Sequence, residues 1–421
     1  MASNNIINVH LFGQEIGRIG METDQQRSSF QYHPEFLESG AMQQMFPPTG
    51  IIKRTPLPQL FSTFNNDTFK GLPPQFADSL PDVFGSIVFK AWLERKQQQS
   101  ISVLEQLAYV GTRGMGALEY SPVKKLPKNS SINISEIVEV LKEVLDLKKT
   151  SGQKDLSTQA LINVFKIGTS AGGARPKILI SEEKTTGQII PGDLEYSDLY
   201  HHYLVKLAMD SDLDYPRERV EYCYALLARQ AGIRMMETKL IDDVHFATLR
   251  FDRQNGEKQH VLTASGITGW DYRSPEYSSY ENLFKLCSFL KIPHAQMEEL
   301  FIRMVFNVLF ENTDDHLKNH SFIYDRSTDS WELAPAYDIT YALNPLLNYT
   351  RSQRALSING KRNDIQLEDL LKLADDFTIK NPEGIVKTLQ ALRPELVRLL
   401  KEHDIPALVI QRMEQSMVDL V

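Results

Sequence analysis

The residues from 312 to 338 constrain the fold of this chain more than any other segment. Two acids, Asp314 and Asp338, and an amide, Asn319, are separated there by short apolar stretches and a turn-forming run of polar residues. The pattern predicts a helix over 297–309, a loop that carries Asp314 and Asn319, and a hairpin that leads to Asp338. Carboxylate and amide oxygens that converge from two strand ends suit a hard cation such as Mg²⁺.

Asp314 and Asn319 stand at the interval that separates two functional residues in the catalytic loop of protein kinases. In that loop the aspartate accepts the proton of the substrate hydroxyl and the asparagine binds magnesium. Asp338 then follows the hairpin, where kinases carry their metal-binding aspartate. Asp and Asn are also common turn residues, so the interval alone is a weak signal and the upstream residues must decide its meaning.

The composition is that of an ordinary soluble protein, with 42% hydrophobic and 24% charged residues in a chain of 421. This length predicts two or three domains. The two cysteines, Cys223 and Cys287, lie in apolar helical patterns and are expected to be small core residues. Their number excludes a disulfide framework or a zinc site, and a reducing cytoplasm fits.

Charge and hydropathy exclude two further classes. No stretch approaches the roughly 18 consecutive apolar residues that a membrane span needs, and the first residues have no signal-peptide character. The net charge of −8 argues against extended direct contact with nucleic acid, although a basic protein partner remains compatible with it. We therefore expect a cytoplasmic protein with no membrane segment.

The apolar pattern divides the chain into four parts. Residues 1–125 contain short strands and a proline-punctuated loop, and residues 126–155 form a polar linker with an amphipathic helix. Residues 156–265 change to the period of strands, interrupted by a helix over 219–231, and residues 266–421 are mostly helical. Strands of the third part are expected at 161–167, 176–180, 203–207, 238–241, 247–251 and 260–263. A small antiparallel sheet followed by a helical domain predicts an α+β fold with the two lobes of a kinase.

Two charged residues in the strand-rich part stand in the order of a kinase ion pair, with a lysine on a strand and a glutamate on the next helix. Lys206 lies in the otherwise apolar stretch 203–208, where a nucleotide-contacting lysine is expected. Glu221 follows near the start of the predicted helix. An edge-strand lysine that prevents aggregation and a solvated helix glutamate are the alternatives.

A glycine-rich segment, 168–177, follows a predicted strand and offers backbone amides that can close on phosphate oxygens. It is neither a Walker A loop nor a Gly-x-Gly-x-x-Gly motif, and a hairpin turn is the alternative for this segment alone. Glycine loop, lysine, glutamate, Asp–Asn pair and final aspartate nevertheless occur in kinase order, which independent turns would rarely reproduce.

With these motifs in place, the chain resembles the HipA family of bacterial serine/threonine kinases, the toxin halves of toxin–antitoxin pairs. The resemblance covers nearly the whole chain and rests on residues 9–17, 76–82, 170–177, 249–253, 314–319 and 337–338. The first two segments look like the family's N-terminal subdomain, the third like its phosphate loop and the fourth like its adenine-side hinge. The last two look like its catalytic and metal motifs.

The resemblance implies a role for each matching residue. Asp314 would be the general base that orients the substrate hydroxyl, and Asn319 and Asp338 would hold Mg²⁺. Lys206, in its ion pair with Glu221, would contact the phosphates of ATP. The other ATP-binding residues that the resemblance implies are Ser170, Ala171, Gly172, Gly173, Ala174 and Lys177 in the loop, Leu249 and Phe251 beside adenine, and His316, Lys318 and Asn319 near the phosphates.

Ser170 matches the loop serine that HipA kinases phosphorylate on themselves. A phosphate there would add a charge of about −1.5 to −2 where the phosphates of ATP must sit, so it is expected to expel the loop and switch the enzyme off. Thr169 is adjacent and is a second possible acceptor.

The resemblance also implies a partner and a substrate. The partner is a dimeric helix-turn-helix antitoxin of the HipB type that binds operator DNA, so that contact with DNA is mainly indirect. The substrate is a protein, with translation components such as aminoacyl-tRNA synthetases as the family expectation. A catalytically silent corepressor that binds the antitoxin and a small-molecule kinase are the alternative functions.

Overall fold

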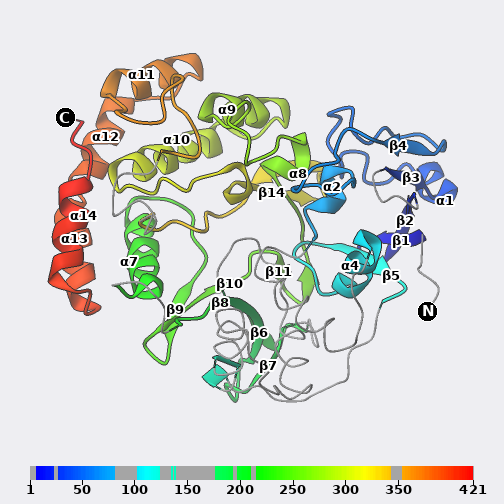
Figure 1. Cartoon of the computed structure of the whole chain (residues 1–421), viewed down its shortest axis with the longest axis horizontal. Helices are drawn as coiled ribbons and strands as arrows, with labels where there is room; N and C mark the ends of the chain where they lie inside the picture. Colours follow the sequence, from blue (N-terminus) through cyan, green and yellow to red (C-terminus); the bar gives the residue numbers. More distant parts are fainter. Residues whose placement is uncertain are drawn as a thin grey trace, which may run out of the picture.

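The computed structural model describes residues 6–22, 27–80, 102–123, 134–135, 137–138, 176–192, 197–209, 215–342 and 353–420. Two five-stranded sheets, a three-stranded sheet and a group of helices build this part of the molecule (Figure 1). The first sheet lies at one end and the last helices at the other, and the second sheet lies below, between the two ends.

The N-terminal sheet is antiparallel and has the strand order β4-β3-β2-β1-β5. Its strands are β1 (Ile6–Leu11), β2 (Gln14–Met21), β3 (Ser28–Tyr32), β4 (Gln59–Phe61) and β5 (Leu118–Ser121). The β1–β2 hairpin turns at Phe12 and Gly13, whose φ angles of 50° and 77° are those of a type I′ turn. Ile7, Val9 and Leu11 are buried, so alternate residues of β1 face the core.

Short helices in the described part accompany this sheet, namely α1 (Pro34–Glu38), α2 (Pro74–Ala77) and α4 (Val103–Val110). A capping box starts α4, because Ser102 Oγ accepts from the amide of Glu105 at 3.1 Å and the Glu105 carboxylate accepts from the amide of Ser102 at 3.0 Å.

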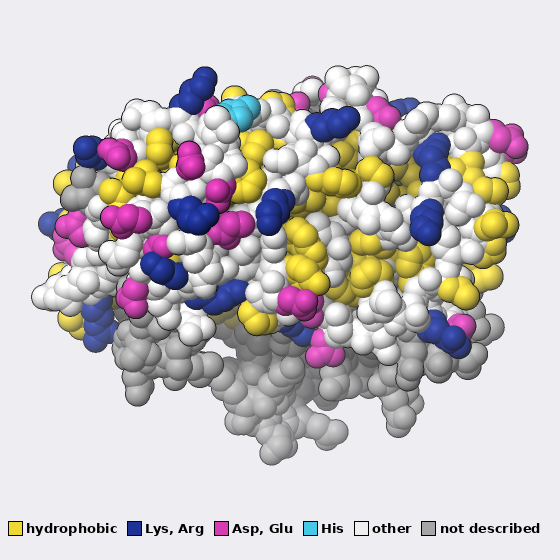
Figure 2. All heavy atoms as spheres, turned by 90° about the horizontal axis from the view of Figure 1, so that it is seen from above, with side chains coloured by type: hydrophobic (Ala, Val, Ile, Leu, Met, Phe, Trp, Pro, Cys, Tyr) yellow, Lys and Arg dark blue, Asp and Glu magenta, His cyan; other side chains and the backbone are white. Residues whose placement is uncertain are grey.

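Seen from above, apolar side chains gather toward the N-terminal side of the molecule, whereas charges of both signs cover the helical side (Figure 2).

The second sheet is also antiparallel and has the order β7-β6-β8-β10-β9, so β8 is its middle strand. Its strands are β6 (Lys177–Glu183), β7 (Ile189–Pro191), β8 (Tyr200–Lys206), β9 (Thr238–Ile241) and β10 (His245–Leu249). The inserted helix α7 (Arg217–Gln230) packs against β9 and β10. Four predicted strands and the predicted helix are therefore confirmed with ends shifted by a few residues. The strand expected at 161–167 lies outside the described residues.

The strand expected at 260–263 forms, but it belongs to another sheet. β13 (His260–Thr263) pairs with β14 (Ser321–Asp325), and β14 pairs with β15 (Ser330–Leu333) in the hairpin that precedes Asp338. A short ribbon of β11 (Arg253–Gln254) and β12 (Glu257–Lys258) joins β10 to β13. The local pattern identified the strand but could not identify its partner, because that partner lies far along the sequence.

The helical lobe contains α8 (Ala264–Thr268), α9 (Tyr280–Phe289), α10 (His294–Leu309), α11 (Leu367–Asp376), α12 (Pro382–Gln390), α13 (Arg393–Glu402) and α14 (Ala407–Ser416). Helix α10 is the predicted helix before Asp314, and it is buried on most of its faces, where apolar residues are joined by Glu299, Arg303 and Asn307. One continuous core joins the N-terminal sheet to this lobe, and it includes Cys223 and Cys287 as expected. The predicted two-lobed α+β fold is confirmed. Among the described helices, none combines the length and apolarity that a membrane crossing requires.

Candidate active site

Lys206 is the last residue of β8, and its side chain is buried. Its Nζ donates to Glu221 Oε1 at 2.6 Å and also to Asp338 Oδ1. Glu221 comes from α7, whereas Asp338 comes from the segment after β15. The central position of β8 excludes an edge-strand lysine, and the burial of Glu221, which is 4% exposed, excludes a solvated helix glutamate.

Lys206 and Asp338 each stabilise the charged form of the other. Burial opposes the charge on Lys206, but the carboxylates of Asp338 and Glu221 outweigh it and raise the pKa of Lys206. Burial also opposes ionisation of Asp338, yet the ammonium groups of Lys206 and Lys177 lower the pKa of Asp338 to about 2. Lys177 stands opposite Lys206 in the register of β6 and β8. A lysine held in this way stays charged at neutral pH, which is the form that binds phosphate oxygens.

The loop after α10 carries Asp314 and Asn319 and ends in a single 3-10 turn, η1 (Leu317–Asn319). The amide of His316 donates to the Asp314 carbonyl at 2.9 Å, and the amide of Asn319 donates to the His316 carbonyl at 2.8 Å. Asn319 Nδ2 also donates to the Asp314 carbonyl at 2.8 Å. Because this bond uses the side-chain nitrogen, the side-chain oxygen of Asn319 remains an acceptor for a ligand.

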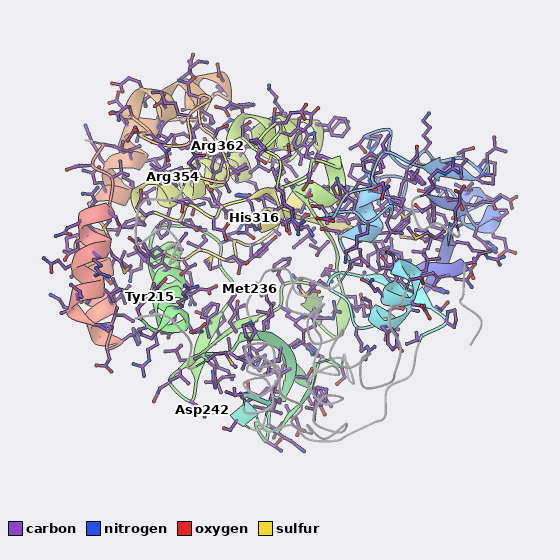
Figure 3. The ribbon with its side chains drawn as sticks, viewed as in Figure 1. Tyr215, Met236, Asp242, His316, Arg354 and Arg362 are labelled. Atoms are coloured by element: carbon purple, nitrogen blue, oxygen red, sulfur yellow. The ribbon has the colours of Figure 1, made fainter. Side chains whose placement is uncertain are left out.

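Residues that the sequence analysis missed hold this loop on the helical lobe. Asp315 is buried and accepts from the Tyr280 hydroxyl at 2.7 Å, and Asn307 Nδ2 donates to the same hydroxyl at 3.0 Å. Arg354, which lies in the helical lobe (Figure 3), donates to the carbonyls of Asn307 at 2.9 Å and Asn312 at 3.2 Å. The last carbonyls of a helix lack partners within it, so Arg354 satisfies the end of α10 and fixes where the loop begins.

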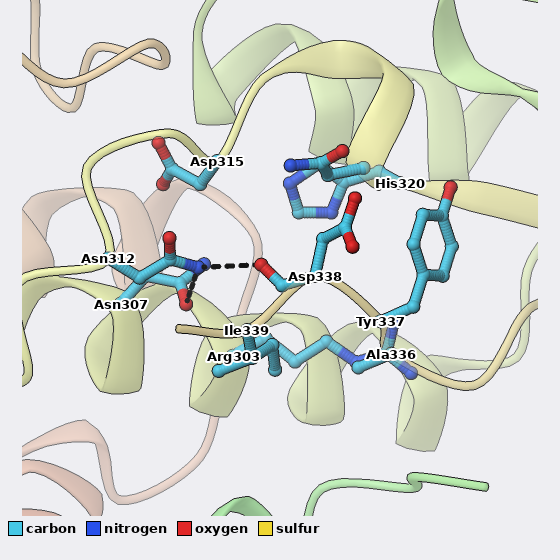
Figure 4. Close-up of a pocket in the computed structure, with 10 residues that line it drawn as sticks. Arg303, Asn307, Asn312, Asp315, His320, Ala336, Tyr337, Asp338 and Ile339 are labelled. Atoms are coloured by element: carbon cyan, nitrogen blue, oxygen red, sulfur yellow. Dashed lines mark hydrogen bonds between the residues drawn. The ribbon is translucent and has the colours of Figure 1, made fainter. Parts of the chain in front are cut away.

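Asn319 and Asp338 meet at one pocket between the end of α10, the loop and the segment 336–339 (Figure 4). The pocket is lined by Arg303, Asn307, Asn312, Asp315, Asn319, His320, Ala336, Tyr337, Asp338 and Ile339. Asn312 Nδ2 donates to the Asp338 carbonyl at 3.4 Å, which Figure 4 draws as a dashed line. Asp338 has a φ of 53°, a conformation that non-glycine residues keep only where the surroundings impose it.

The donors at this pocket fit Mg²⁺. Lys206 contacts one carboxylate oxygen of Asp338, which leaves the other oxygen and the amide oxygen of Asn319 for a cation. Mg²⁺ prefers oxygen ligands and is commonly held by one or two side chains together with waters and substrate phosphates. Across the residues that the structure describes, no three His, Cys, Asp or Glu side chains gather as an all-protein metal site. These two residues would therefore hold Mg²⁺ together with a phosphate ligand.

Asp314 lies at the surface of the loop, where a substrate can reach it. Desolvation by the neighbouring protein raises the pKa of Asp314, and the negative charge of Asp338 adds to this effect, whereas His316 and Lys206 oppose it. A carboxylate with a raised pKa is a stronger proton acceptor than an ordinary aspartate. Position and electrostatics thus suit a general base.

His316 and Lys318 lie on the outer side of the same loop, against Tyr272. The ring centroids of His316 and Tyr272 are 4.9 Å apart, and Lys318 Nζ lies 5.4 Å from the centre of the Tyr272 ring. Figure 3 places His316 where the helical lobe meets the N-terminal region. His316 is close enough to lower the pKa of both Asp314 and Asp338.

The predicted hinge contacts the segment 336–339, which carries Asp338, through aromatic packing. Leu249 ends β10 and is partly buried against the core of the second sheet. Phe251 is buried and stacks on Tyr337, with ring centroids 5.8 Å apart. The Tyr337 hydroxyl donates to the Lys318 carbonyl at 2.7 Å. Tyr337 therefore contacts both the hinge and the loop of Asp314.

Between these two hinge residues and beyond them lies a second charged cluster, whose members are Arg250, Asp252 and Arg253. Asp252 is fully buried and bonds both arginines at 2.8–2.9 Å.

Five residues of the glycine loop, Ser170, Ala171, Gly172, Gly173 and Ala174, lie outside the described residues. Lys177, the last residue of that motif, is buried at the start of β6.

Two family models match the chain. The HipA N-terminal domain matches residues 7–121, and the HipA-like C-terminal domain matches residues 169–398. Two curated relatives carry the name "Putative kinase". The one from Haemophilus influenzae is 27% identical over 51% of this chain and 66% of its own length. The one from Sinorhizobium fredii is 25% identical over 45% of this chain and 51% of its own length. The chain thus matches about half to two thirds of these relatives.

Among solved structures, the fold is similar to that of HipA from Shewanella oneidensis, determined in a complex with HipB and operator DNA. The TM-score is 0.66 at 17% identity, and the alignment covers 97% of this chain and 94% of that chain. This similarity shows the fold, and the family models show the descent. The chain belongs to the HipA family, with the N-terminal and C-terminal domains of that family on a two-lobed, kinase-like fold.

Proposed function

We propose that the protein is an ATP- and Mg²⁺-dependent serine/threonine-protein kinase of the HipA toxin type. The observation that carries this proposal is the cluster in which Lys206 bonds Glu221 at 2.6 Å and contacts Asp338. This cluster joins the second sheet, helix α7 and the segment 336–339 in the arrangement that active kinases require. Asp314 stands beside it with a raised pKa.

Each residue has a separate task in phosphoryl transfer. Glu221 holds the Lys206 ammonium in place, and Lys206 binds phosphate oxygens of ATP. Asn319 and Asp338 would hold Mg²⁺, which supplies charge neutralisation of the phosphates when it is bound. Asp314 orients the acceptor hydroxyl and takes its proton as the oxygen attacks the γ-phosphorus, while the bond from that phosphorus to the β–γ bridging oxygen breaks and ADP leaves.

Autophosphorylation of Ser170 is part of the proposal. The glycine-rich segment leads directly into β6, whose first residue, Lys177, stands opposite Lys206. We therefore assign the phosphates of ATP to this segment. A phosphate on Ser170 would bring about −1.5 to −2 charges toward Asp338 and oppose ATP binding.

The partner that we propose is a dimeric helix-turn-helix antitoxin of the HipB type. The similar HipA structure contains HipB and operator DNA, and this chain aligns with nearly all of that HipA. Because the net charge is −8, contact with DNA belongs mainly to the antitoxin. The substrate would be a cytoplasmic protein, with translation components such as aminoacyl-tRNA synthetases as the first candidates.

Calorimetric titration with Mg²⁺ and ATP tests the proposal. Wild-type protein should bind the nucleotide, and Asp338→Ala should weaken its binding at least tenfold because a metal ligand is lost. Asp376→Ala, an exposed aspartate on α11, is the matched control and should bind as the wild type does. An unaltered affinity in Asp338→Ala would refute the metal role. A wild type that binds ATP but never transfers its phosphate would favour the silent corepressor.

A further inference from the structure

Two groups of cations flank the loop of Asp314. Lys177 and Lys206 surround Asp338, and Lys206 has carboxylate partners on two sides. The second group consists of Arg273 and Lys318, which lie over the ring of Tyr272, and of Lys70 from the N-terminal region, whose positive charge interacts with theirs. Lys206 binds the phosphates of ATP in the transfer described above, and Lys318 is expected near them, whereas Lys70 and Arg273 of the second group have no role in that transfer.

Tyr272 is the centre of the second group. Lys318 Nζ lies 5.4 Å and Arg273 Cζ 5.6 Å from the centre of its ring, and Arg273 Nε donates to its hydroxyl at 3.2 Å. The His316 ring packs on Tyr272 with a centroid distance of 4.9 Å. Lys318 and His316 belong to the five-residue interval between Asp314 and Asn319, so the group directly adjoins the proposed base.

Lys70 comes from the N-terminal region. Its loop is tied to the segment of Tyr272 because Thr68 Oγ1 donates to Asp271 Oδ1 at 2.7 Å. Lys70 is half-buried, and burial together with the positive charges of Lys318 and Arg273 lowers its pKa. The group is thus composite, since both domains of the chain contribute to it.

Two carboxylates, those of Asp67 and Asp271, stand near the second group, and the charges of both act on Arg273. Asp67 lies 3.6 Å from Arg273 but is 95% exposed, where an ion pair contributes little. Asp271 Oδ1 accepts from the Thr68 hydroxyl and from the amide of Arg273 at 3.0 Å, and these neutral donors leave the charge of the carboxylate in place beside Arg273. Within the described ranges, no carboxylate lies at ion-pair distance from Lys70 or Lys318. Lys70 and Lys318 therefore repel one another with no carboxylate paired to either, and an anionic ligand relieves that repulsion.

We propose that Lys70, Arg273 and Lys318 form an acceptor-side basic patch that binds an acidic segment of the protein substrate while its hydroxyl faces Asp314. The inference rests on the proposed kinase function and names the substrate class of the same site. Acidic residues close to the acceptor serine or threonine then set specificity. The N-terminal region takes part in choosing the substrate through Lys70.

Fluorescence anisotropy with two labelled peptides tests this inference. Both peptides contain one serine, and the flanking residues are glutamates in one and glutamines in the other. The wild type should bind the glutamate peptide at least tenfold more tightly, and added salt should reduce the difference. Lys70→Gln and Arg273→Gln should each reduce this preference about three- to tenfold. Lys401→Gln, which removes one positive charge from the exposed surface of α13, should leave it unchanged.

The affinity for ATP, measured on the same samples, separates this inference from the proposed function. Lys70→Gln and Arg273→Gln should retain it, because neither residue belongs to the ATP site. Equal binding of the two peptides, absence of binding, or an unchanged preference in both variants overturns the basic patch and leaves the kinase proposal standing. Loss of ATP binding in the wild type overturns the kinase proposal, and the anisotropy result still reports on the patch.

Discussion

Two charged clusters of this protein differ in whether a carboxylate remains open to solvent. In the first, Lys206 lies between Glu221 and Asp338, and the Asp338 side chain is 27% exposed. In the second, the Asp252 carboxylate lies between Arg250 and Arg253, and these side chains are 0–1% exposed. The first cluster keeps an oxygen of Asp338 available for a ligand, whereas the second is closed to solvent.

The surroundings of the second cluster explain why it is closed. The amide of Gly116 donates to Asp252 Oδ2 at 2.7 Å, and Arg253 donates to the carbonyls of Gly114 at 2.8 Å and Gly116 at 3.0 Å. Backbone and side chains together saturate the carboxylate, and they tie the N-terminal region to the segment after β10. Buried charge of this kind supports the structure, while partly exposed charge with spare acceptors serves function.

The largest expected effect is loss of stability on breaking the closed cluster. Asp252→Ala leaves two buried guanidinium groups without their counter-charge, which should lower the free energy of unfolding by about 3–5 kcal/mol. Asp338→Ala should cost less than about 2 kcal/mol, because Glu221 still pairs with Lys206. Urea unfolding of the two variants beside the wild type measures both values. Equal losses would contradict the distinction between the clusters.

The pH dependence of phosphoryl transfer should separate the roles of Asp314 and Asp338. Asp314 must be ionised to accept a proton, and its raised pKa places the acid limb above the value of about 4 for an ordinary aspartate. Below that pKa the rate should fall about tenfold per pH unit. Asp338, with a pKa of about 2, stays ionised in this range.

Single-turnover rates and ATP affinity, measured over the same pH series, provide the test. The rate should fall on acidification while the nucleotide affinity stays constant, and circular dichroism should show that the fold persists. An affinity that falls together with the rate would mean that the metal site, rather than the base, is titrating.

A smaller effect is expected from the support of the catalytic loop. Tyr280→Phe removes a hydroxyl that donates to Asp315 at 2.7 Å and accepts from Asn307 at 3.0 Å. It should lower stability by about 1–3 kcal/mol and reduce kcat more than it raises the KM for ATP. Tyr324→Phe is the matched control, because its hydroxyl bonds Asp329 in the β14–β15 hairpin. Similar losses of kcat in both variants would argue against a specific role for Tyr280.

The smallest effect should come from an exposed ion pair. Lys372 and Asp376 are 3.1 Å apart on α11, with side chains 58% and 47% exposed. Lys372→Gln should change the free energy of unfolding by no more than about 0.5 kcal/mol. If urea unfolding shows a larger change in the free energy of unfolding, burial does not explain why the cluster of Asp252 stabilises the fold more than an exposed ion pair does.

The sequence predicted those site residues whose order along the chain is itself a signal. Lys206, Glu221, Asp314, Asn319 and Asp338 follow the kinase order, and the structure brings them together around one pocket and its edge. Local periodicity likewise predicted the helix α10 and four of the five strands of the second sheet, all but β7. Their roles in binding ATP and Mg²⁺ stay predictions.

Other features depend on tertiary contacts that a local pattern does not contain. Arg354 bonds carbonyls at the end of α10, and any arginine in the sequence could have done so. Asp252 lies in the segment assigned to the hinge, but its partner Gly116 belongs to the N-terminal region. The basic group at Tyr272 joins residues 70 and 273, which are far apart in the sequence. Such contacts become visible only when the fold is known.

Intact-mass and peptide mass spectrometry after incubation with Mg²⁺ and ATP tests the central claim most directly. The wild type and Asp314→Asn are compared, and the starting mass of each shows any phosphate already present. The account predicts one added phosphate on Ser170 in the wild type and none in Asp314→Asn. Phosphate on Ser170 in both proteins would contradict the role of Asp314. Its absence from an initially unmodified wild type would contradict the proposed autophosphorylation.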